Sequence, residues 1–391
     1  MPPKPKVLPG RPGNLSPDQE QSLKDLWAAL FAVFDFPGSN HQKYSKQKLA
    51  GSVKTRSDSV TDKYAQKNDF QNALANTPPH ELRAAFWRMV KQDNPDALLL
   101  RFLRARKWDV NPALVMLVST MHWRVNEVEH FMEQGEEHFV NNDKDTIKQI
   151  RLGKSFTYGY DLKDRPVVYI RARLHRSSDQ SQESTERYTV YLMETIRLFL
   201  NEPVDQTCIV FDLTDFSISN MDYPPVKFLI KCLEAHYPES LGQCIIHKAP
   251  WIFQGIWTVI KGWLDPVVAS KFVFTRNLTD IEKYISPNQL LKEVGGNDPY
   301  EYTFIEPLQN ENKWMKYYPA RDKILAERAE IVSRLEGYTR SWYSTDEKVN
   351  QQEIRAQRTD QIHKLCENYR RLDPYVRARS IYDRNGSLKV R

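Results

Sequence analysis

The feature that most constrains this chain is a series of short apolar runs that alternate with helical patterns. The runs are Pro166–Ile170, Thr207–Asp212, Gln243–His247 and Lys271–Phe274. Nearly continuous apolar runs of this length are typical of strands that are buried on both faces, as in parallel sheets. Apolar residues at helical spacing separate them, over residues 186–200, 224–235 and 251–263. The pattern predicts an α/β fold with a mixed, mostly parallel sheet covered by helices.

The segments on either side of this region differ from it in composition. Ser16, Pro17 and Gln19 mark a helix start, with a capping hydroxyl, a proline at the first helical position and a capping-box glutamine. Along the chain we expect a disordered segment (1–14), an N-terminal helix (15–38), a polar linker (39–68), a small helical subdomain (79–140), the sheet domain (141–307) and a charged helical extension (308–391). The apolar stripe of the extension is broken, so the pattern leaves its docking open.

Composition indicates a cytoplasmic, reducing location. No run approaches the roughly 18–20 apolar residues that a membrane helix needs. Residues 1–12 are rich in proline and lysine and lack the apolar core of a secretory signal. The cysteines are Cys208, Cys232, Cys244 and Cys366, with no CxxC pair among them. Three of them fall in segments predicted to be core, where a thiol behaves as a small hydrophobic group.

The basic residues of the chain are concentrated in its last segment. Residues 310–391 contain 18 Lys/Arg and 12 Asp/Glu, which matches the net charge of +6 for the whole chain. One interpretation is a solvated helix with a basic end. The other is attraction to an anionic membrane surface, worth roughly 1 kcal/mol for each well-placed basic residue.

The motifs that carry enzyme chemistry are missing from the sequence. There is no GxSxG, no HExxH and no Cys/His spacing typical of a metal site. Gly153-Lys154-Ser155 is similar to the end of a P-loop, but Lys148 occupies the position of the required upstream glycine. His247 follows an apolar strand, where a satisfied polar group is the simpler interpretation than a base. We therefore predict no catalytic residue and no metal ligand. The absence of RRM, KH and zinc-finger signatures argues against nucleic-acid binding.

Several sequence blocks occur in an order that is specific to one family. The blocks are Leu99–Val110, Asp212–Ser219, Tyr237–Gly242 running into Ile245–Pro250, Trp263–Pro266 followed by Ser270-Lys271, and Gly295-Gly296. Over about residues 79–307 the chain resembles the CRAL-TRIO lipid-binding family. It is most similar to the fungal yeast-type phosphatidylinositol transfer proteins, in particular to their non-classical members.

The resemblance implies a sheet that forms the floor of a deep hydrophobic lipid pocket, with a gating helix over its mouth. Residues 251–263 match that helix, and Phe253, Ile256, Trp257 and Ile260 follow one another on it at helical spacing. The same stripe would be unexceptional in a soluble core. As a gate, it would cover lipid tails when closed and contact a bilayer when open.

The resemblance also implies a phosphoinositide headgroup site. The positions that match it are Arg106, Lys107, Glu239 and Lys271. Lys271 and an adjacent basic residue would bind phosphate, and Glu239 would orient Lys271 or accept from inositol hydroxyls. Val268 stands where the family pattern has a threonine, which removes a hydroxyl donor worth about 0.5–1.5 kcal/mol.

A second lipid would occupy a pocket around Val168, Tyr169, Phe211, Ser217, Ser219 and His247. The family tyrosine that serves choline lipids aligns with Val168, unless Tyr169 replaces it by a one-residue shift that would turn its side chain to the other face. We therefore expect squalene, a sterol or another hydrophobic molecule rather than phosphatidylcholine as the second ligand.

The function expected from the resemblance is transfer of phosphatidylinositol, and of a second hydrophobic lipid, between membranes. The protein would be a monomer, without a cofactor other than its bound lipid, that presents lipid to kinases or phospholipases. It would associate transiently with endosome, endoplasmic reticulum or lipid droplet surfaces. One alternative is a carrier of a single neutral hydrophobic molecule. Another is a lipid-regulated scaffold that recruits partners through its N-terminal helix or its C-terminal extension, in which case deletion of residues 320–391 would leave transfer intact.

Overall fold

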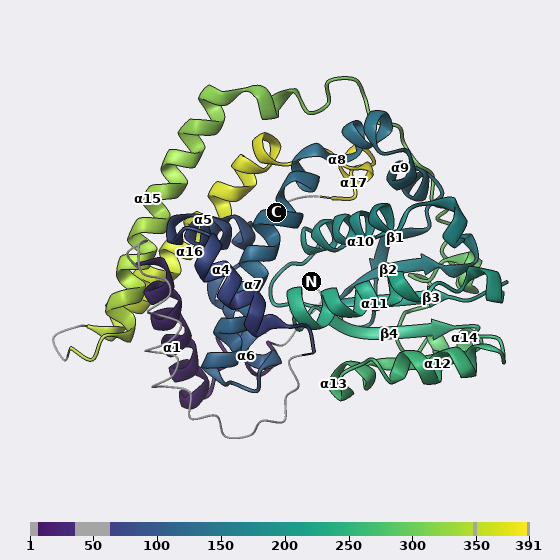
Figure 1. Cartoon of the computed structure of the whole chain (residues 1–391), viewed down its shortest axis with the longest axis horizontal. Helices are drawn as coiled ribbons and strands as arrows, with labels where there is room; N and C mark the ends of the chain where they lie inside the picture. Colours follow the sequence, from purple (N-terminus) through teal and green to yellow (C-terminus); the bar gives the residue numbers. More distant parts are fainter. Residues whose placement is uncertain (1–6, 36–62, 347–349, 389–391) are drawn as a thin grey trace. The chain divides into compact units, whose positions relative to one another are not determined.

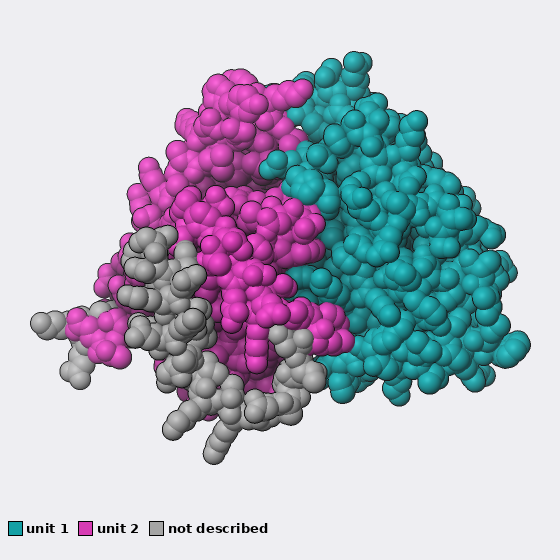
Figure 2. Space-filling view, viewed as in Figure 1, with its two compact units in different colours: residues 1–6, 130–314, 377–391 teal, residues 7–129, 315–376 magenta. Residues whose placement is uncertain are grey.

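The computed structural model of the chain describes residues 7–35, 63–346 and 350–388 (Figure 1). They form two compact units (Figure 2). Unit 1 contains residues 130–314 and 377–388, and unit 2 contains the described parts of 7–129 and 315–376.

A five-stranded sheet forms the centre of unit 1. Its strands are β1 (Ser155–Tyr160), β2 (Pro166–Arg171), β3 (Thr207–Asp212), β4 (Leu241–His247) and β5 (Phe272–Thr275). They lie side by side in chain order, with β1 antiparallel to β2 and all other neighbours parallel. The predicted α/β fold with a mixed, mostly parallel sheet is confirmed.

The two faces of the sheet are both buried but are covered differently. One face carries Val168, Ile209 and Cys244 and packs against α10 (Gln182–Arg197), α11 (Tyr223–Lys231) and α12 (Phe253–Lys261). The other face carries Tyr169 and Val210 and packs against apolar side chains of residues 278–302. In that segment only α14 (Leu278–Ile281) is an α-helix. Largely irregular chain therefore covers this face, whereas the sequence pattern predicted a helical cover for the sheet.

The remaining α-helices of unit 1 lie near the two ends of its sequence, except for one short helix that precedes β5. They are α8 (Glu129–Asn142), α9 (Lys144–Arg151), α13 (Pro266–Ala269) and α17 (Ile381–Arg384). Helix α8 is kinked at Gly135, where φ is +63° and an added Cβ would lie 2.3 Å from Ala378 Cβ. Only glycine avoids both penalties, so this position fixes the close approach of the C-terminal segment.

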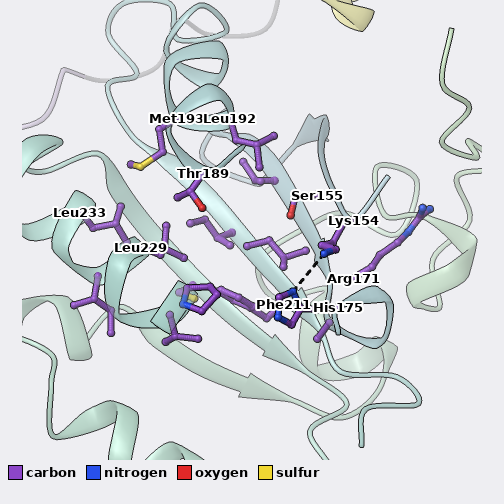
Figure 3. A pocket seen from close by; sticks show the side chains of 18 of the residues that line it. Lys154, Ser155, Arg171, His175, Thr189, Leu192, Met193, Phe211, Leu229 and Leu233 are labelled. Atoms are coloured by element: carbon purple, nitrogen blue, oxygen red, sulfur yellow. Dashed lines mark hydrogen bonds between the residues drawn. The ribbon is translucent and has the colours of Figure 1, made fainter. Parts of the chain in front are cut away.

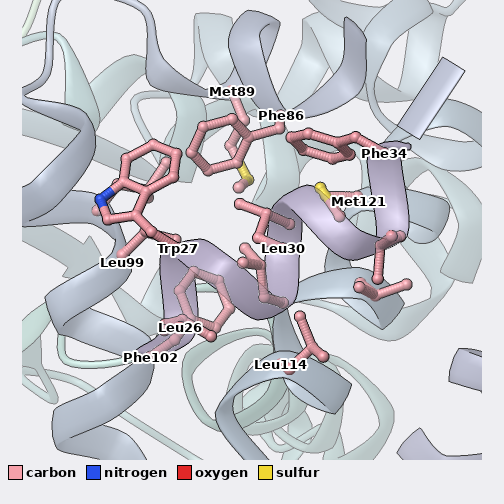
Figure 4. Close-up of a cluster of buried hydrophobic side chains, with 14 of the residues drawn as sticks. Leu26, Trp27, Leu30, Phe34, Phe86, Met89, Leu99, Phe102, Leu114 and Met121 are labelled. Carbon is pink, nitrogen blue, oxygen red and sulfur yellow. The ribbon is translucent and has the colours of Figure 1, made fainter. Parts of the chain in front are cut away.

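The regular elements of unit 2 are all helices in its described parts, which also include an isolated β-bridge between Arg11 and Asn14. Its helices are α1 (Pro17–Phe34), α4 (Gln66–Asn76), α5 (Pro79–Val90), α6 (Pro95–Ala105), α7 (Val110–Glu127), α15 (Tyr318–Tyr343) and α16 (Gln351–Val376). They share one apolar core, part of which is drawn in Figure 4 around Trp27, Leu30 and Phe86.

The C-terminal helices are an integral part of this core. Ile331 and Leu335 of α15 and Leu365 of α16 are buried in it. Their stripe is broken in sequence because buried cations interrupt it. Arg358 pairs with Asp96 at 2.8 Å, and Asp96 also accepts from Trp27 Nε1 at 2.7 Å.

The predicted flanking segments fall partly outside the described residues, as 1–6 and 36–62 do. Residues 7–14, for which we expected disorder, form hydrogen-bonded turns, with Gly10 N donating to Asn14 O at 2.9 Å. Residues 66–68, assigned to the linker, belong to the first turn of α4.

Candidate functional site

Unit 1 contains a cavity of about 230 Å³ between the sheet and its helical cover (Figure 3). A buried water needs only roughly 10–15 Å³, so this space is much larger than a packing defect. Most of its lining is aliphatic or aromatic. Helix α10 contributes Leu192 and Met193, and Leu229 and Leu233 line the side formed by α11 and the π-helical turn that follows it.

The register of the parallel strands builds the floor of the cavity. Val168, Ile209, Cys244 and Phe272 are partners across four strands, and Ile170, Phe211 and Ile246 form the next row on the same face. All of these side chains line the cavity. Because side chains alternate along a strand, every second residue of β2, β3 and β4 is directed to this space.

Helix α12 closes the cavity opposite the floor. Phe253, Trp257 and Ile260 line the cavity from this helix, and Ile256 packs in the same apolar cluster without lining it. On the outer side, Val259 is 44% exposed, and Trp251 just before the helix is 84% exposed. One helix thus presents apolar groups both to the cavity and to the surroundings.

A polar cluster that sequence reasoning missed lies at the carboxyl end of β2. Lys154, only 5% exposed, donates to Gln180 Oε1 at 2.8 Å, and its Nζ lies 3.3 Å from His175 Nδ1. The Nε2 atom of His175 lies 3.1 Å from Asp222 Oδ2. Burial lowers the pKa of Lys154 to about 8, and burial together with Lys154 lowers the pKa of His175. Lys154, His175 and Asp222 all line the cavity.

The opposite end of the cavity, at the amino ends of β3 and β4, is also polar. Thr207, Ser240 and Tyr237 line it there. The Tyr237 hydroxyl donates to the buried carboxylate of Glu194 at 2.8 Å. The cavity therefore has an apolar middle and two polar ends.

The predicted headgroup residues are divided between the units, and none of them lines the cavity. In unit 1, Glu239 and Lys271 precede β4 and β5, so both lie at the amino edge of the sheet. In unit 2, Arg106 caps the C-terminus of α6 and donates to Gln66 Oε1 at 2.7 Å. Lys107 follows it in a left-handed conformation and is exposed.

The predicted residues of the second-lipid pocket are only partly brought together. Val168 and Phe211 line the cavity. Tyr169 stacks on Phe156 on the other face, because its position is one residue out of register with the cavity side. His247 is also directed away from the cavity, and its ring nitrogens lie 2.9 Å from Thr275 Oγ1 and 3.0 Å from Val294 O.

Ser217 and Ser219 do not line the cavity either. They are exposed and hydrogen-bond to each other at 2.8 Å in the turn after β3, where Ser217 also donates to Asn220 Oδ1. The placement of these two serines and of Tyr169 and His247 corrects the predicted second-lipid pocket. The middle of its sheet side is formed by apolar groups such as Val168, Ile209 and Phe211 instead.

The depressed pKa of Lys154 leads to a stability prediction. Replacing Lys154 with methionine should raise the free energy of unfolding at pH 7 by about 1–3 kcal/mol. Each unit by which folding lowers the pKa of the ammonium group corresponds to about 1.4 kcal/mol of lost stability, which the variant recovers. The hydrogen bonds that the variant loses offset part of this gain. Between pH 8 and 10.5 the unfolded wild type binds more protons than the folded protein, so its stability rises and the advantage of the variant shrinks.

Urea denaturation at pH 7, 9 and 10.5 measures this difference. Lys283→Met, at a lysine whose side chain is 64% exposed, is the matched control and should change stability little at any pH. A Lys154→Met protein that is less stable than wild type at pH 7 would contradict the prediction.

Comparison with known proteins adds two family matches. The model described as "CRAL/TRIO domain" matches residues 150–296, and "CRAL/TRIO, N-terminal domain" matches residues 66–119. The chain is 43% identical to the CRAL-TRIO domain-containing protein C3H8.02 of Schizosaccharomyces pombe, over 97% of this chain and 92% of that protein. It is 38% identical to the phosphatidylinositol transfer protein CSR1 of Eremothecium gossypii, over 98% and 99% of the two chains.

Among solved structures, the crystal structure of Sfh5 matches 73% of this chain and 89% of its own, with 18% identity and a TM-score of 0.47. Within the described residues, no helix is both long enough and apolar enough to span a membrane.

Proposed function

The chain belongs to the CRAL/TRIO family, as its sequence blocks predicted, and on this basis we propose that it carries phosphatidylinositol between membranes. The observation that carries the proposal is the apolar cavity of unit 1, which the sheet and α12 enclose. The high identity to a protein named as a phosphatidylinositol transfer protein supports the choice of lipid.

The cavity supplies what a lipid carrier needs physically. Each CH₂ group of an acyl chain costs roughly 0.8 kcal/mol when it moves from an apolar environment into water, so a lipid leaves a bilayer slowly on its own. A cavity with an aliphatic and aromatic lining replaces the bilayer around the acyl chains. The largest part of the desorption cost is thereby removed.

The headgroup proposal rests on charge at the edge of the sheet. Glu239 and Lys271 lie at the amino ends of neighbouring strands, close in the chain to Ser240 and Phe272, which line the cavity. A phosphate there would accept charge-assisted hydrogen bonds from Lys271, with Glu239 orienting the lysine or accepting from inositol hydroxyls. Arg106 and Lys107 remain proposed headgroup residues on the basis of the family pattern.

Helix α12 would act as the gate. Its inner residues, including Trp257, would cover the acyl chains in the closed state. The exposed Trp251 and Val259 would contact the bilayer during exchange, since tryptophan suits the interface of a membrane. The carrier would be cytoplasmic and would visit endosome, endoplasmic reticulum or lipid droplet surfaces, where it would present lipid to kinases or phospholipases.

A second candidate function is carriage of one neutral hydrophobic molecule, such as squalene or a sterol. The observation that favours it is the sheet side of the cavity, where Val168, Ile209 and Phe211 provide no hydroxyl group. In this case Lys271 would not matter for transport.

Vesicle transfer of labelled phosphatidylinositol separates the two functions. Lys271→Ala should slow transfer by about tenfold or more, because a hydrogen bond to a charged group contributes roughly 1.5–3 kcal/mol. The control Lys283→Ala removes an exposed lysine and should leave transfer unchanged. Equal transfer by the two variants, or no transfer by the wild type, would contradict the proposal.

A further inference from the structure

The two polar ends of the cavity lie far apart along the sheet. Ser240 and Thr207 line the end at the amino ends of β3 and β4, close in the chain to Glu239 and Gln206. The other end, lined by Lys154, His175 and Asp222, lies beyond the carboxyl end of β2. Strand β3 runs between them with six residues, which span about 17–20 Å. A group bound at one end is therefore out of reach of the other.

The end of the cavity beyond the carboxyl end of β2 contains a buried cation, Lys154, whose hydrogen-bond partners are neutral. Lys154 Nζ contacts Gln180 Oε1 at 2.8 Å, and its contacts with Gln149 Oε1 and His175 Nδ1 are longer, at 3.4 and 3.3 Å. In the described part of the chain, Lys154 forms no ion pair with a carboxylate. A buried ammonium group without a directly bound counter-ion is costly, and an incoming anion would relieve that cost.

The two carboxylates near Lys154 already contact other basic side chains, a lysine and a histidine. Asp179 pairs with Lys148 at 3.6 Å, and Asp222 faces His175 Nε2 at 3.1 Å. When Nε2 donates to Asp222, Nδ1 is left as an acceptor that faces Lys154. This arrangement fixes the imidazole, and the dashed line in Figure 3 marks its 3.3 Å contact with the ammonium group of Lys154.

We infer that Lys154, held by His175 and Asp222, binds the anionic oxygen of a second lipid whose tail fills the apolar middle of the cavity. The ligand class is an amphipathic lipid that ends in a carboxylate, as in a fatty acid, or in a phosphate. The inference rests on the proposed lipid-carrier function and names the second ligand. An anionic oxygen would replace the two long contacts of Lys154 without disturbing its short bond to Gln180.

Two ligands that differ only in charge test the inference on the unmodified full-length protein. We expect cis-parinaric acid to bind at pH 7 about tenfold or more tightly than its methyl ester, measured by fluorescence titration, since only the acid offers a charged acceptor. Equal affinity of acid and ester would overturn the inference. Displacement of the acid by 1-oleoyl lysophosphatidate would support it and show that phosphate is accepted. Failure of lysophosphatidate to displace the acid would support the carboxylate as the ligand.

Variants then assign the preference to a residue. Lys154→Met should lower the affinity for the acid to that for the ester, whereas Lys283→Met should keep the preference. An undiminished preference in Lys154→Met would overturn the assignment. Phosphatidylinositol transfer should depend on Lys271 and persist in Lys154→Met. In the wild type, equal affinity for acid and ester together with intact transfer would refute only this inference, and absent transfer together with a clear acid preference would refute only the phosphatidylinositol function.

Discussion

Replacing Arg384 with methionine should lower the free energy of unfolding of unit 1 by about 3–5 kcal/mol, because it leaves a buried carboxylate without its cation. That carboxylate belongs to Glu136, which is fully buried and ion-paired with Arg384. It also accepts from the Tyr191 hydroxyl at 2.5 Å and from Ile381 N at 3.0 Å. Burial already raises the pKa of Glu136 while Arg384 opposes this, so the loss in the variant should shrink at low pH, where Glu136 becomes protonated.

Urea denaturation of the full chain measures this loss. The control is Arg151→Met, whose exposed pair with Glu306 should contribute no more than about 1 kcal/mol. Adding Glu136→Gln to Arg384→Met should recover part of the stability, since a neutral amide needs no counter-ion. Similar losses for Arg384→Met and Arg151→Met would contradict a buried charge cluster.

This cluster changes how the scaffold hypothesis has to be tested. Deleting residues 320–391 would remove Arg384 and also Tyr382, whose hydroxyl accepts from Thr157 N of β1 at 2.9 Å. Residues 377–388 belong to unit 1, so the deletion would damage the lipid cavity together with any partner site. Substitutions at exposed residues of α15, such as Leu325, would test partner binding without removing the residues that stabilise unit 1.

Filling the cavity should abolish lipid carriage with little loss of stability. Met193 of α10 lines the cavity and is drawn in Figure 3. A tryptophan there would occupy part of the cavity of about 230 Å³ in which the lipid chain would lie. We expect Met193→Trp to reduce vesicle transfer of phosphatidylinositol at least tenfold and to change the unfolding free energy by less than about 1.5 kcal/mol, because the cavity has room for the added atoms.

Leu308→Trp is the matched control, because Leu308 belongs to the same unit and is 67% exposed. It adds the same indole outside the cavity and should transfer lipid as the wild type does. Undiminished transfer by Met193→Trp would mean that the lipid does not bind in this cavity.

Much of unit 1 could be predicted because its strands are nearly continuous apolar runs. The apolar pattern predicts buried strands at Thr207–Asp212 and Gln243–His247. The first is β3, and the second lies within the longer β4. The sequence pattern assigned both Val168 and Tyr169 to the second-lipid pocket. Neighbouring residues of a strand are directed to opposite faces of the sheet, so only one of the two can line it. Only Val168 lines the cavity.

Other features depend on contacts between residues that are remote in sequence. Lys154 and His175 are 21 residues apart, and Asp222 is 47 residues beyond His175. No local sequence pattern therefore predicts that the three side chains form a cluster. The sequence pattern also could not predict that α15 and α16 pack in the core of unit 2. Their buried arginines Arg328 and Arg358 interrupt the apolar stripe, and only the fold shows the acceptors that each arginine finds.

The most direct test of the account is mass spectrometry of the lipid extracted from purified full-length protein, with wild type and Met193→Trp prepared side by side from one host. The account predicts stoichiometric phosphatidylinositol with the wild type and a loss of at least about tenfold with Met193→Trp, as expected when the cavity that shields the acyl chains from water is filled. Wild-type protein that contains no phosphatidylinositol and takes none up from vesicles would contradict it.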